Sequence, residues 1–390
     1  MELKRWIILL IALLTADCPT GRAEGFRNLE SEITALMRDY KAIGVSVAVV
    51  KDNHIVYSGA FGYKDRESQT KLSPDDAFRI ASVTKTFVAT AIMKLIEKKR
   101  LSLDDDVNSY LDFPVRNPNY PDKPVTVRML LCHRSSINDS QGCNSFDMIN
   151  PATNDNYHAC YNDYEPGSRY QYCNYNYNIL GAVIENVSGK RIDRFIVNKI
   201  IRPLRLHGRF VVTEKDSAVF AKAYRYSEKR DSFVLSRDAY FPFDYELERY
   251  RLGYSTPVLY PAGGLKISAT ELAKYMLMHM NNGKYKIRRI IKEESEFSLR
   301  QLPVQTHWYA LSITHYNNNV LPGEELLGQT GGGYGIHTAM IFHPEKKYGF
   351  VVFCNGCNSK STNGRELNYE IIECLYRNLI SADFDGQVMR

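Results

Sequence analysis

Long apolar runs and an excess of one charge are both lacking in this sequence of 390 residues. The unbroken apolar run at residues 6–14 is far shorter than the roughly 20 residues that cross a bilayer core, so no transmembrane segment is expected after signal cleavage. The 50 lysines and arginines are interspersed with 44 aspartates and glutamates, which leaves a net charge of +6. No helix-turn-helix, zinc-finger or RNA-binding aromatic motif is present, so we expect no nucleic-acid partner.

The N-terminal segment has the charge pattern of a secretory signal peptide. Lys4 and Arg5 precede the apolar run, and small and polar residues follow it. We therefore expect residues 1–23 to be removed by a signal peptidase, with cleavage after Ala16 as the alternative. The mature protein is then expected to be periplasmic or secreted.

The sequence contains eight cysteines, which in an exported protein suggests disulfides. Cys143 and Cys160 flank one polar loop and are the pair we expect to be bonded. Cys354 and Cys357 form a single C-x-x-C, for which a redox motif or half a metal site is the less favoured interpretation. Two half-buried thiols or a local disulfide are favoured there. Cys18 would permit a lipid anchor, which we disfavour because an aspartate precedes it.

Runs of β-branched and aromatic residues lie near both ends of the mature chain. Residues 44–51 and 54–63 predict an antiparallel hairpin around the turn Asp52-Asn53. Three more strands are predicted near the C-terminus, at 308–316, 337–344 and 348–354.

Segments with apolar residues at helical spacing lie before, between and after these strands. Apolar stripes predict a first helix over 26–40 and a last one over 366–379. Because strands from opposite ends of the chain must pair, one antiparallel sheet flanked by helices is expected, with a mostly helical subdomain inserted. We predict a single α/β (α+β) domain over 24–390, with its α/β part at about 24–80 and 300–390 and its helical part at about 81–299.

Ser82 and Lys85 lie in the first turn of a strongly amphipathic predicted helix. Their spacing of three places both side chains on one helix face. A serine hydroxyl is a weak nucleophile until a neighbouring group takes its proton, and a partly desolvated amine at a helix start can help. The helix N-terminus also favours the negative charge that develops during acyl transfer. Because the S-x-x-K spacing alone is common, the sequence around it decides whether it indicates a catalytic pair.

The segment 79–107, which continues to Asp104 and Asp105, resembles the first motif of the serine β-lactamase-like and penicillin-binding protein family. This family holds class C β-lactamases, D-alanyl-D-alanine carboxypeptidases and family VIII esterases. The resemblance runs from about residue 30 to 380. It implies a β-lactamase/transpeptidase-like fold, Ser82 as nucleophile with Lys85 as its partner, and neither a metal nor an organic cofactor.

The segment 164–190 resembles the second region of the family, in which a proline-glycine turn leads to tyrosine-x-asparagine and a helix. Tyr172 and Asn174 fill those two positions. The resemblance implies that Tyr172 acts as the general base, or relays to it. It also implies that Asn174 orients Lys85 and the carbonyl side of the substrate.

A glycine-rich segment near the C-terminus resembles the third motif, in which lysine or histidine precedes threonine and glycine. This chain has Gln329, Thr330 and Gly331. The glycines allow a substrate to approach the backbone, and the N–H groups of Gly332 and Ser82 are expected to form an oxyanion hole. The neutral Gln329 cannot hold a substrate carboxylate as a cation would, which disfavours efficient hydrolysis of β-lactams or D-alanyl peptides.

Two further stretches, 125–139 and 261–276, extend the resemblance without adding chemistry. His133 lies in the first of them and could suggest a Ser-His pair, but its counterpart in the family is structural. We therefore expect no catalytic role for His133.

The sequence leaves three functions open. The favoured one is an exported serine hydrolase that acts through an acyl-enzyme on a small-molecule or peptide substrate carrying an ester, an amide or a peptidoglycan-like group. The second is a β-lactamase or D-alanyl-D-alanine carboxypeptidase proper. The third is a catalytically inactive relative that binds a ligand.

Overall fold

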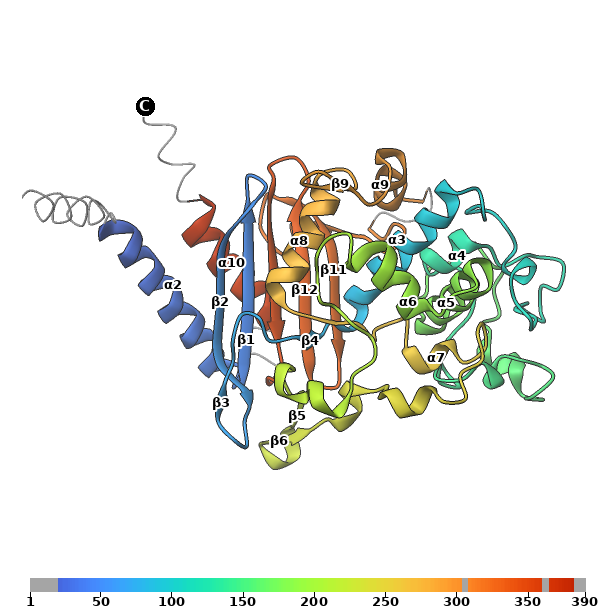
Figure 1. The fold of residues 1–390 in the computed structure, drawn as a ribbon, viewed down its shortest axis with the longest axis horizontal. Coiled ribbons are helices and arrows are strands. Elements are labelled where there is room, and N and C mark those ends of the chain that lie inside the picture. Colours follow the sequence, from blue (N-terminus) through green and yellow to red (C-terminus); the bar gives the residue numbers. More distant parts are fainter. Residues whose placement is uncertain (1–19, 304–307, 360–364, 382–390) are drawn as a thin grey trace, which may run out of the picture.

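A seven-stranded antiparallel sheet forms the centre of the structure (Figure 1). The structure is a computed structural model and describes residues 20–303, 308–359 and 365–381. The strand order is β10-β11-β12-β13-β1-β2-β3. Its strands are β1 (Gly44–Lys51), β2 (His54–Asp65), β3 (Thr70–Lys71), β10 (Thr314–Asn317), β11 (Glu325–Gly333), β12 (Ile336–His343) and β13 (Tyr348–Cys354). Strands from the two ends of the chain pair at the centre, where Val47 of β1 lies opposite Val352 of β13.

Three pairs of short strands lie outside the main sheet. They are β4 (Phe78–Arg79) with β7 (Lys266–Ile267), β5 (Tyr224–Ser227) with β6 (Ser232–Leu235), and β8 (Lys284–Tyr285) with β9 (Arg288–Arg289). The helices are α2 (Thr20–Asp39), α3 (Thr84–Glu97), α4 (Val127–Leu131), α5 (Asn174–Ser188), α6 (Ile192–Ile196), α7 (Thr256–Leu259), α8 (Ala269–Met280), α9 (Glu293–Arg300) and α10 (Leu367–Leu379).

Helices cover both faces of the sheet, so its central strands are apolar on both sides. Val47 and Val49 of β1 belong to the core formed with α2 and α10, whereas Ala48 and Val50 face the larger core that holds α3, α5 and α8. This alternation follows from the two-residue repeat of a strand. Figure 1 shows α2 and α10 on one side of the sheet and the helical region on the other.

The predicted fold class is confirmed by this sheet and its flanking helices. The β1–β2 hairpin turns at Asp52 and Asn53, whose φ angles of 49° and 67° are those that an asparagine-containing tight turn requires. Although α8 falls inside the range expected for the helical part, it packs on the sheet.

The strand predicted over 308–316 is wrong for most of its length, since β10 comprises Thr314–Asn317. Before it, the N–H of Ala310 donates to the carbonyl of Ile313, and Ser312 has a φ of 75°. The chain therefore makes a turn there, and its successive apolar residues are buried between the sheet edge and the helical region. A run of apolar residues does not distinguish a buried turn from a strand.

The predicted Cys143–Cys160 disulfide is also wrong, because both residues are free, buried thiols. Cys143 Sγ contacts the hydroxyl of Tyr260 at 3.8 Å, while Cys160 Sγ donates to the carbonyl of Met148 at 3.4 Å. The two sulfurs thus have separate partners across the loop. Cys354 and Cys357 are likewise free and are more deeply buried than the sequence suggested.

Most of the predicted signal peptide, including Cys18, lies outside the described residues. The helix predicted over 26–40 is present as α2, which ends at Asp39 but begins six residues earlier, at Thr20, within the range predicted for the signal peptide. Across the described ranges, no helix combines the length and apolarity needed to cross a bilayer.

Candidate active site

Ser82 lies at a sharp bend where a short 3-10 turn, Ala81–Val83, leads into α3. Ala81 has a φ of 45°, in the left-handed region that residues with a Cβ seldom occupy. The backbone of Gly263 supports this bend, since a Cβ placed there would lie 3.3 Å from the carbonyl carbon of Ala81. The bend exposes part of Ser82 while Ala81 and Val83 on either side are buried.

Lys85 is completely buried, one turn along from Ser82. Its Nζ donates to Ser82 Oγ at 3.2 Å, to Asn174 Oδ1 at 2.9 Å and to the carbonyl of Ala262 at 2.6 Å. A protonated lysine has three N–H donors, so each donor has an acceptor here. Three such contacts offset the cost of burying an ammonium group.

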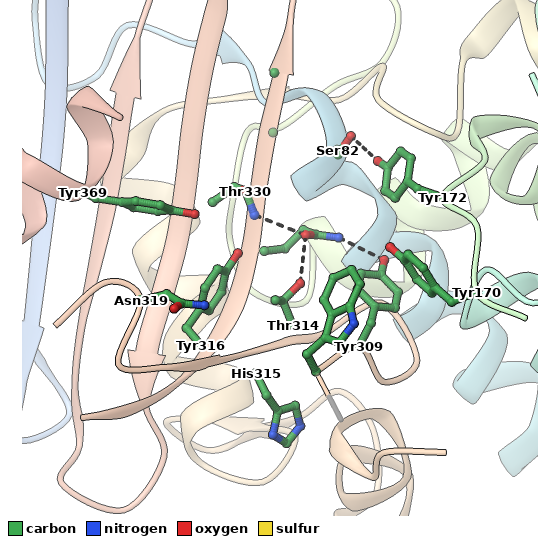
Figure 2. A pocket seen from close by; sticks show the side chains of 14 residues that line it. Ser82, Tyr170, Tyr172, Tyr309, Thr314, His315, Tyr316, Asn319, Thr330 and Tyr369 are labelled. Carbon is green, nitrogen blue, oxygen red and sulfur yellow. Dashed lines mark hydrogen bonds between the residues drawn. The ribbon is translucent and has the colours of Figure 1, made fainter. Parts of the chain in front are cut away.

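Tyr172, two residues before the start of α5, is the second side chain that contacts Ser82. Its hydroxyl donates to Ser82 Oγ at 2.6 Å, a contact that Figure 2 marks with a dashed line. Lys85 Nζ lies 4.9 Å from the centre of the Tyr172 ring. The structure thus brings Ser82, Lys85, Tyr172 and Asn174 into one hydrogen-bonded cluster, although 89 residues separate Lys85 from Asn174 in the sequence.

Asp139 supports this cluster from behind, a role that the sequence interpretation missed. Its Oδ2 accepts hydrogen bonds from the backbone N–H and the side-chain amide of Asn174, at 2.8 and 3.0 Å. Its Oδ1 accepts the N–H of Tyr175 at 3.0 Å and the thiol of Cys173 at 3.2 Å. Asp139 therefore caps α5 from a distant loop and fixes the Asn174 amide with its oxygen toward Lys85.

His133 does not form a Ser-His pair in this structure. Its Nδ1 accepts the N–H of Cys173 at 3.2 Å, and its ring packs against that of Tyr172 with 4.3 Å between centres. Burial, and secondarily the positive charge of Lys85, holds the pKa of His133 well below its usual range. A neutral, buried imidazole behind Tyr172 agrees with the expected structural role.

Strand β11 passes directly beside Ser82. A Cβ added to Gly331 would lie 2.6 Å from the carbonyl oxygen of Ile80 and 2.8 Å from the backbone nitrogen of Ser82. Only glycine permits this approach. The backbone N–H of Thr330 donates to the side-chain oxygen of Gln329 at 3.2 Å instead of to β12. Along a strand, the N–H groups of every second residue point to the same side. The N–H of the exposed Gly332 therefore points away from β12, toward the pocket.

Gln329 belongs to this site by position, but its side chain is occupied within the protein. Its Nε2 donates to the hydroxyl of Tyr309 at 3.1 Å, and its Oε1 accepts the hydroxyl of Thr314 at 3.4 Å and the N–H of Thr330. Only 4% of the residue is exposed. Gln329 therefore joins β11 to the segment before β10 and is unavailable to a ligand in this arrangement.

A pocket of about 740 Å³ opens beside Ser82 and is lined largely by aromatic side chains. Figure 2 shows Tyr170 and Tyr172 on the Ser82 side, Tyr316 and Tyr369 across the pocket, and Tyr309 between them. The described lining residues are Ser82, Tyr170, Tyr172, Trp308, Tyr309, Thr314, His315, Tyr316, Asn319, Gln329, Thr330, Gly331, Gly332 and Tyr369. This set contains no lysine, arginine, aspartate or glutamate.

Arg79 joins the loops that surround the cluster, which is a second contribution the sequence interpretation missed. It is buried, and its Nε donates to the carbonyl of Gly263 at 2.8 Å, next to the carbonyl that holds Lys85. Its guanidinium lies between the rings of Tyr260 and Tyr334, 5.3 and 4.7 Å from their centres. Arg79 thus holds the 260–264 loop against the turn that follows β11.

Comparison with known proteins places these residues in a family context. A family model described as Beta-lactamase matches residues 29–371. The protein flp of Staphylococcus aureus (strain NCTC 8325 / PS 47) is 27% identical over 327 residues, which cover 80% of this chain and 59% of flp. The chain therefore spans less than two thirds of the length of the curated relatives it matches first.

Solved structures show the same architecture. The octameric penicillin-binding protein homologue from Pyrococcus abyssi is 28% identical with a TM-score of 0.71, over 91% of this chain and 77% of that one. EstCE1, described as a hydrolase with promiscuous acyltransferase activity, is 20% identical with a TM-score of 0.70, over 92% of this chain and 100% of that one. At 20% identity the second likeness concerns the fold alone.

Proposed function

The chain belongs to the β-lactamase family, and from that premise we propose that it is an exported serine hydrolase that cleaves an ester or amide through an acyl-enzyme on Ser82. The observation that carries this proposal is the contact of one hydroxyl, Ser82 Oγ, with both the phenol of Tyr172 and the amine of Lys85. Nucleophile and base within hydrogen-bonding distance, with the base oriented by a third group, are the requirements of nucleophilic catalysis.

We assign Lys85 the cationic form in the mechanism, in which its three N–H donors match the three oxygen atoms around Nζ. In the reacting form, we assign the negative charge to Tyr172 beside that cation, so the direction of the 2.6 Å hydrogen bond reverses and Ser82 gives its proton to Tyr172. Ser82 Oγ attacks the substrate carbonyl. The same proton passes from Tyr172 to the leaving alcohol or amine as its bond to the carbonyl carbon breaks.

The negative charge on the carbonyl oxygen is assigned to the backbone N–H groups of Ser82 and Gly332. The close approach of β11 to Ser82 supports this assignment, as does the outward direction of the Gly332 N–H. Backbone donors fixed before the reaction stabilise a developing oxyanion without reorganisation. In the second half of the reaction, Tyr172 takes a proton from water while the water oxygen attacks the acyl carbon. The bond from that carbon to Ser82 Oγ then breaks, and Tyr172 returns the proton to Oγ, which frees the carboxylic acid product and restores the Ser82 hydroxyl.

The composition of the pocket favours a neutral substrate over a β-lactam or a peptide with a free carboxylate. The described lining residues include no lysine or arginine to hold a carboxylate, and the Gln329 amide is already bonded to Tyr309 and Thr314. The aromatic walls instead offer apolar faces and hydroxyl groups, which suit an uncharged ester or amide.

The proposal of export rests on the sequence pattern of residues 1–23 alone. The apolar run in that segment lies outside the residues that the structure describes. A periplasmic or secreted location gives the enzyme access to small esters, amides and peptidoglycan-like peptides. Its experimental measure is the fraction of the protein recovered outside the cytoplasm with residues 1–23 removed.

The function is tested with the purified mature protein, its Ser82→Ala variant and three reagents: a fluorophosphonate probe, short p-nitrophenyl esters and a fluorescent penicillin. We expect probe labelling and ester turnover that both require Ser82, with little penicillin labelling. Durable penicillin labelling would instead indicate a β-lactamase or carboxypeptidase. A folded protein that gives no signal with any reagent would indicate an inactive, ligand-binding relative.

A further inference from the structure

A cluster of cations lies far from the pocket, around the hairpin formed by β8 and β9. The sequence spreads its charges along the chain, but the fold gathers several basic side chains here. A cavity of about 350 Å³ beside the hairpin is lined by Arg205, Lys274, Lys286 and Arg288 together with Pro203, Leu204, Tyr285 and Ile287. The described lining of this cavity contains no acidic residue.

These four cations have no ion-pair partner among the described residues. Three of the acids on the neighbouring helices have other partners. Glu271 of α8 bonds to His207, and Glu296 of α9 bonds to His279 and Arg300. Glu293, at the start of α9, accepts the side-chain amide of Asn282 at 2.9 Å. Among the described residues, these three carboxylates therefore form no ion pair with the hairpin cations.

An apolar side chain projects from the middle of this cluster. Ile287 occupies the tip of the hairpin, between Lys286 and Arg288, and is 88% exposed. It is the most exposed large apolar side chain in the described ranges. Isoleucine is normally buried in soluble proteins. Its exposure at a tip surrounded by cations indicates a surface that can bind a partner through both apolar contact and positive charge.

The hairpin lies at the opposite end of α3 from Ser82. Lys94, near the end of α3, donates to the carbonyl of Ile290, which directly follows β9. The twelve residues from Ser82 to Lys94 correspond to about 18 Å of helix. In Figure 1, β9 lies at the upper edge of the molecule, beside α8 and α9. A partner bound at this hairpin would therefore leave the entrance to the catalytic pocket free.

We propose that the β8–β9 hairpin docks the protein on the surface of an anionic phospholipid bilayer. The four cations attract the phosphate groups of the lipids, and Ile287 inserts between the lipid headgroups. Basic residues around an exposed apolar side chain are the combination by which proteins bind the interface of anionic membranes. A soluble polyanion would be held by the cations alone and would leave Ile287 in water.

The proposal is tested by sedimentation of the mature protein with vesicles of phosphatidylcholine, with and without phosphatidylglycerol, at low and high salt. Binding is expected only with phosphatidylglycerol and is expected to weaken as salt rises. Each cation near an anionic leaflet contributes a factor of roughly five in binding, so Lys286→Gln with Arg288→Gln is expected to reduce binding about 25-fold. Ile287→Ser is expected to weaken binding without changing its salt dependence.

The matched control is Lys229→Gln with Arg230→Gln, which removes the same two charges from the tip of the β5–β6 hairpin. It is expected to leave vesicle binding within twofold of wild type, and unchanged melting temperatures show that each variant is folded. Three results would overturn the proposal: equal binding to vesicles without phosphatidylglycerol, equal loss of binding in the control, or binding to soluble heparin with none to vesicles. Ester turnover is measured separately from vesicle binding, so a failure of the membrane proposal can be distinguished from a failure of the catalytic proposal.

Discussion

The carboxylate of Asp139 accepts hydrogen bonds from both the backbone N–H and the side-chain amide of Asn174, whose oxygen in turn accepts a hydrogen bond from Lys85. A single carboxylate thereby fixes the start of α5 and the orientation of the amide that faces the buried ammonium. Asp139 is a positioning residue in this account, since it touches neither Ser82 nor the pocket.

Replacing Asp139 with asparagine should lower kcat about tenfold to a hundredfold while KM changes little. One carboxylate oxygen becomes an N–H group and faces donors, so Asn174 shifts away from Lys85 and the amine loses its fixed position. Loss of the cap should also cost about 1–2 kcal/mol in the free energy of unfolding. Steady-state kinetics and chemical denaturation measure the two effects.

Asp104→Asn is the control for Asp139. Asp104 is exposed and paired with Arg128, so its removal should cost less than about 1 kcal/mol and leave kcat unchanged. Equal kinetic losses in the two variants would show that the position of Asp139 has no special importance.

Gly331→Ala should reduce turnover at least about 100-fold, the usual effect of losing an oxyanion donor. Its methyl group would lie 2.6 Å from the Ile80 carbonyl oxygen and 2.8 Å from the Ser82 nitrogen, which separates β11 from the start of α3. The same methyl at Gly332 has its nearest neighbour at 3.9 Å, so Gly332→Ala should cause a smaller loss. If both variants lost activity equally, steric separation of β11 could not be the cause.

Gln329→Lys should increase the rate of acylation by penicillin and decrease ester turnover. The new ammonium would lie beside Tyr309 and Thr314, at the edge of a pocket whose described lining has no lysine or arginine. Gln329→Met is the neutral control of similar length and should give no gain with penicillin. A gain of similar size in both variants would mean that charge at this position does not select the substrate.

Acidification should destabilise the protein partly through His133. Burial and the charge of Lys85 keep the pKa of His133 well below its ordinary value of 6.5, so below that pH the unfolded chain binds a proton that the folded protein does not. The free energy of unfolding should therefore fall by up to about 1.4 kcal/mol per pH unit from pH 6.5 downward. Urea denaturation at pH 7 and pH 5 measures this slope.

His133→Asn should flatten that slope, because asparagine has no proton to gain. Asparagine also tolerates the φ of 57° at this position, so the backbone need not change. His337 and His343, whose pKa values burial also lowers, remain in both proteins and cancel in the comparison. An unchanged slope in the variant would assign the acid sensitivity to other groups.

Much of the fold could be predicted from the sequence because its strands and helices have clear periods. The β1–β2 hairpin, β12, β13 and the terminal helices α2 and α10 lie within a few residues of their predicted ranges. The segment before β10 looks like a strand in the sequence because its residues are apolar at consecutive positions, but the structure buries them in a turn. Strand β11 is absent from the predicted strands because its sequence is rich in glycine, although its glycines form an extended strand beside Ser82.

The motifs indicated which residues meet at the site, but not what supports them. Ser82, Lys85, Tyr172 and Asn174 could be named from their spacing and family resemblance. The role of Asp139 depends on a loop that folds back onto the start of α5, and no local pattern encodes that contact. The internal bonding of Gln329 likewise depends on Tyr309, twenty residues away, so the sequence showed its lack of charge but not its occupied amide.

The most direct test of the account is to trap the acyl-enzyme. A slow p-nitrophenyl ester is mixed with the mature protein, the reaction is quenched with acid during the first turnover, and the masses of the protein and its peptides are measured. The account predicts one acyl group per chain, on the peptide that carries Ser82, and none in Ser82→Ala. Acylation of another residue, or turnover of the ester by Ser82→Ala at the wild-type rate, would contradict it.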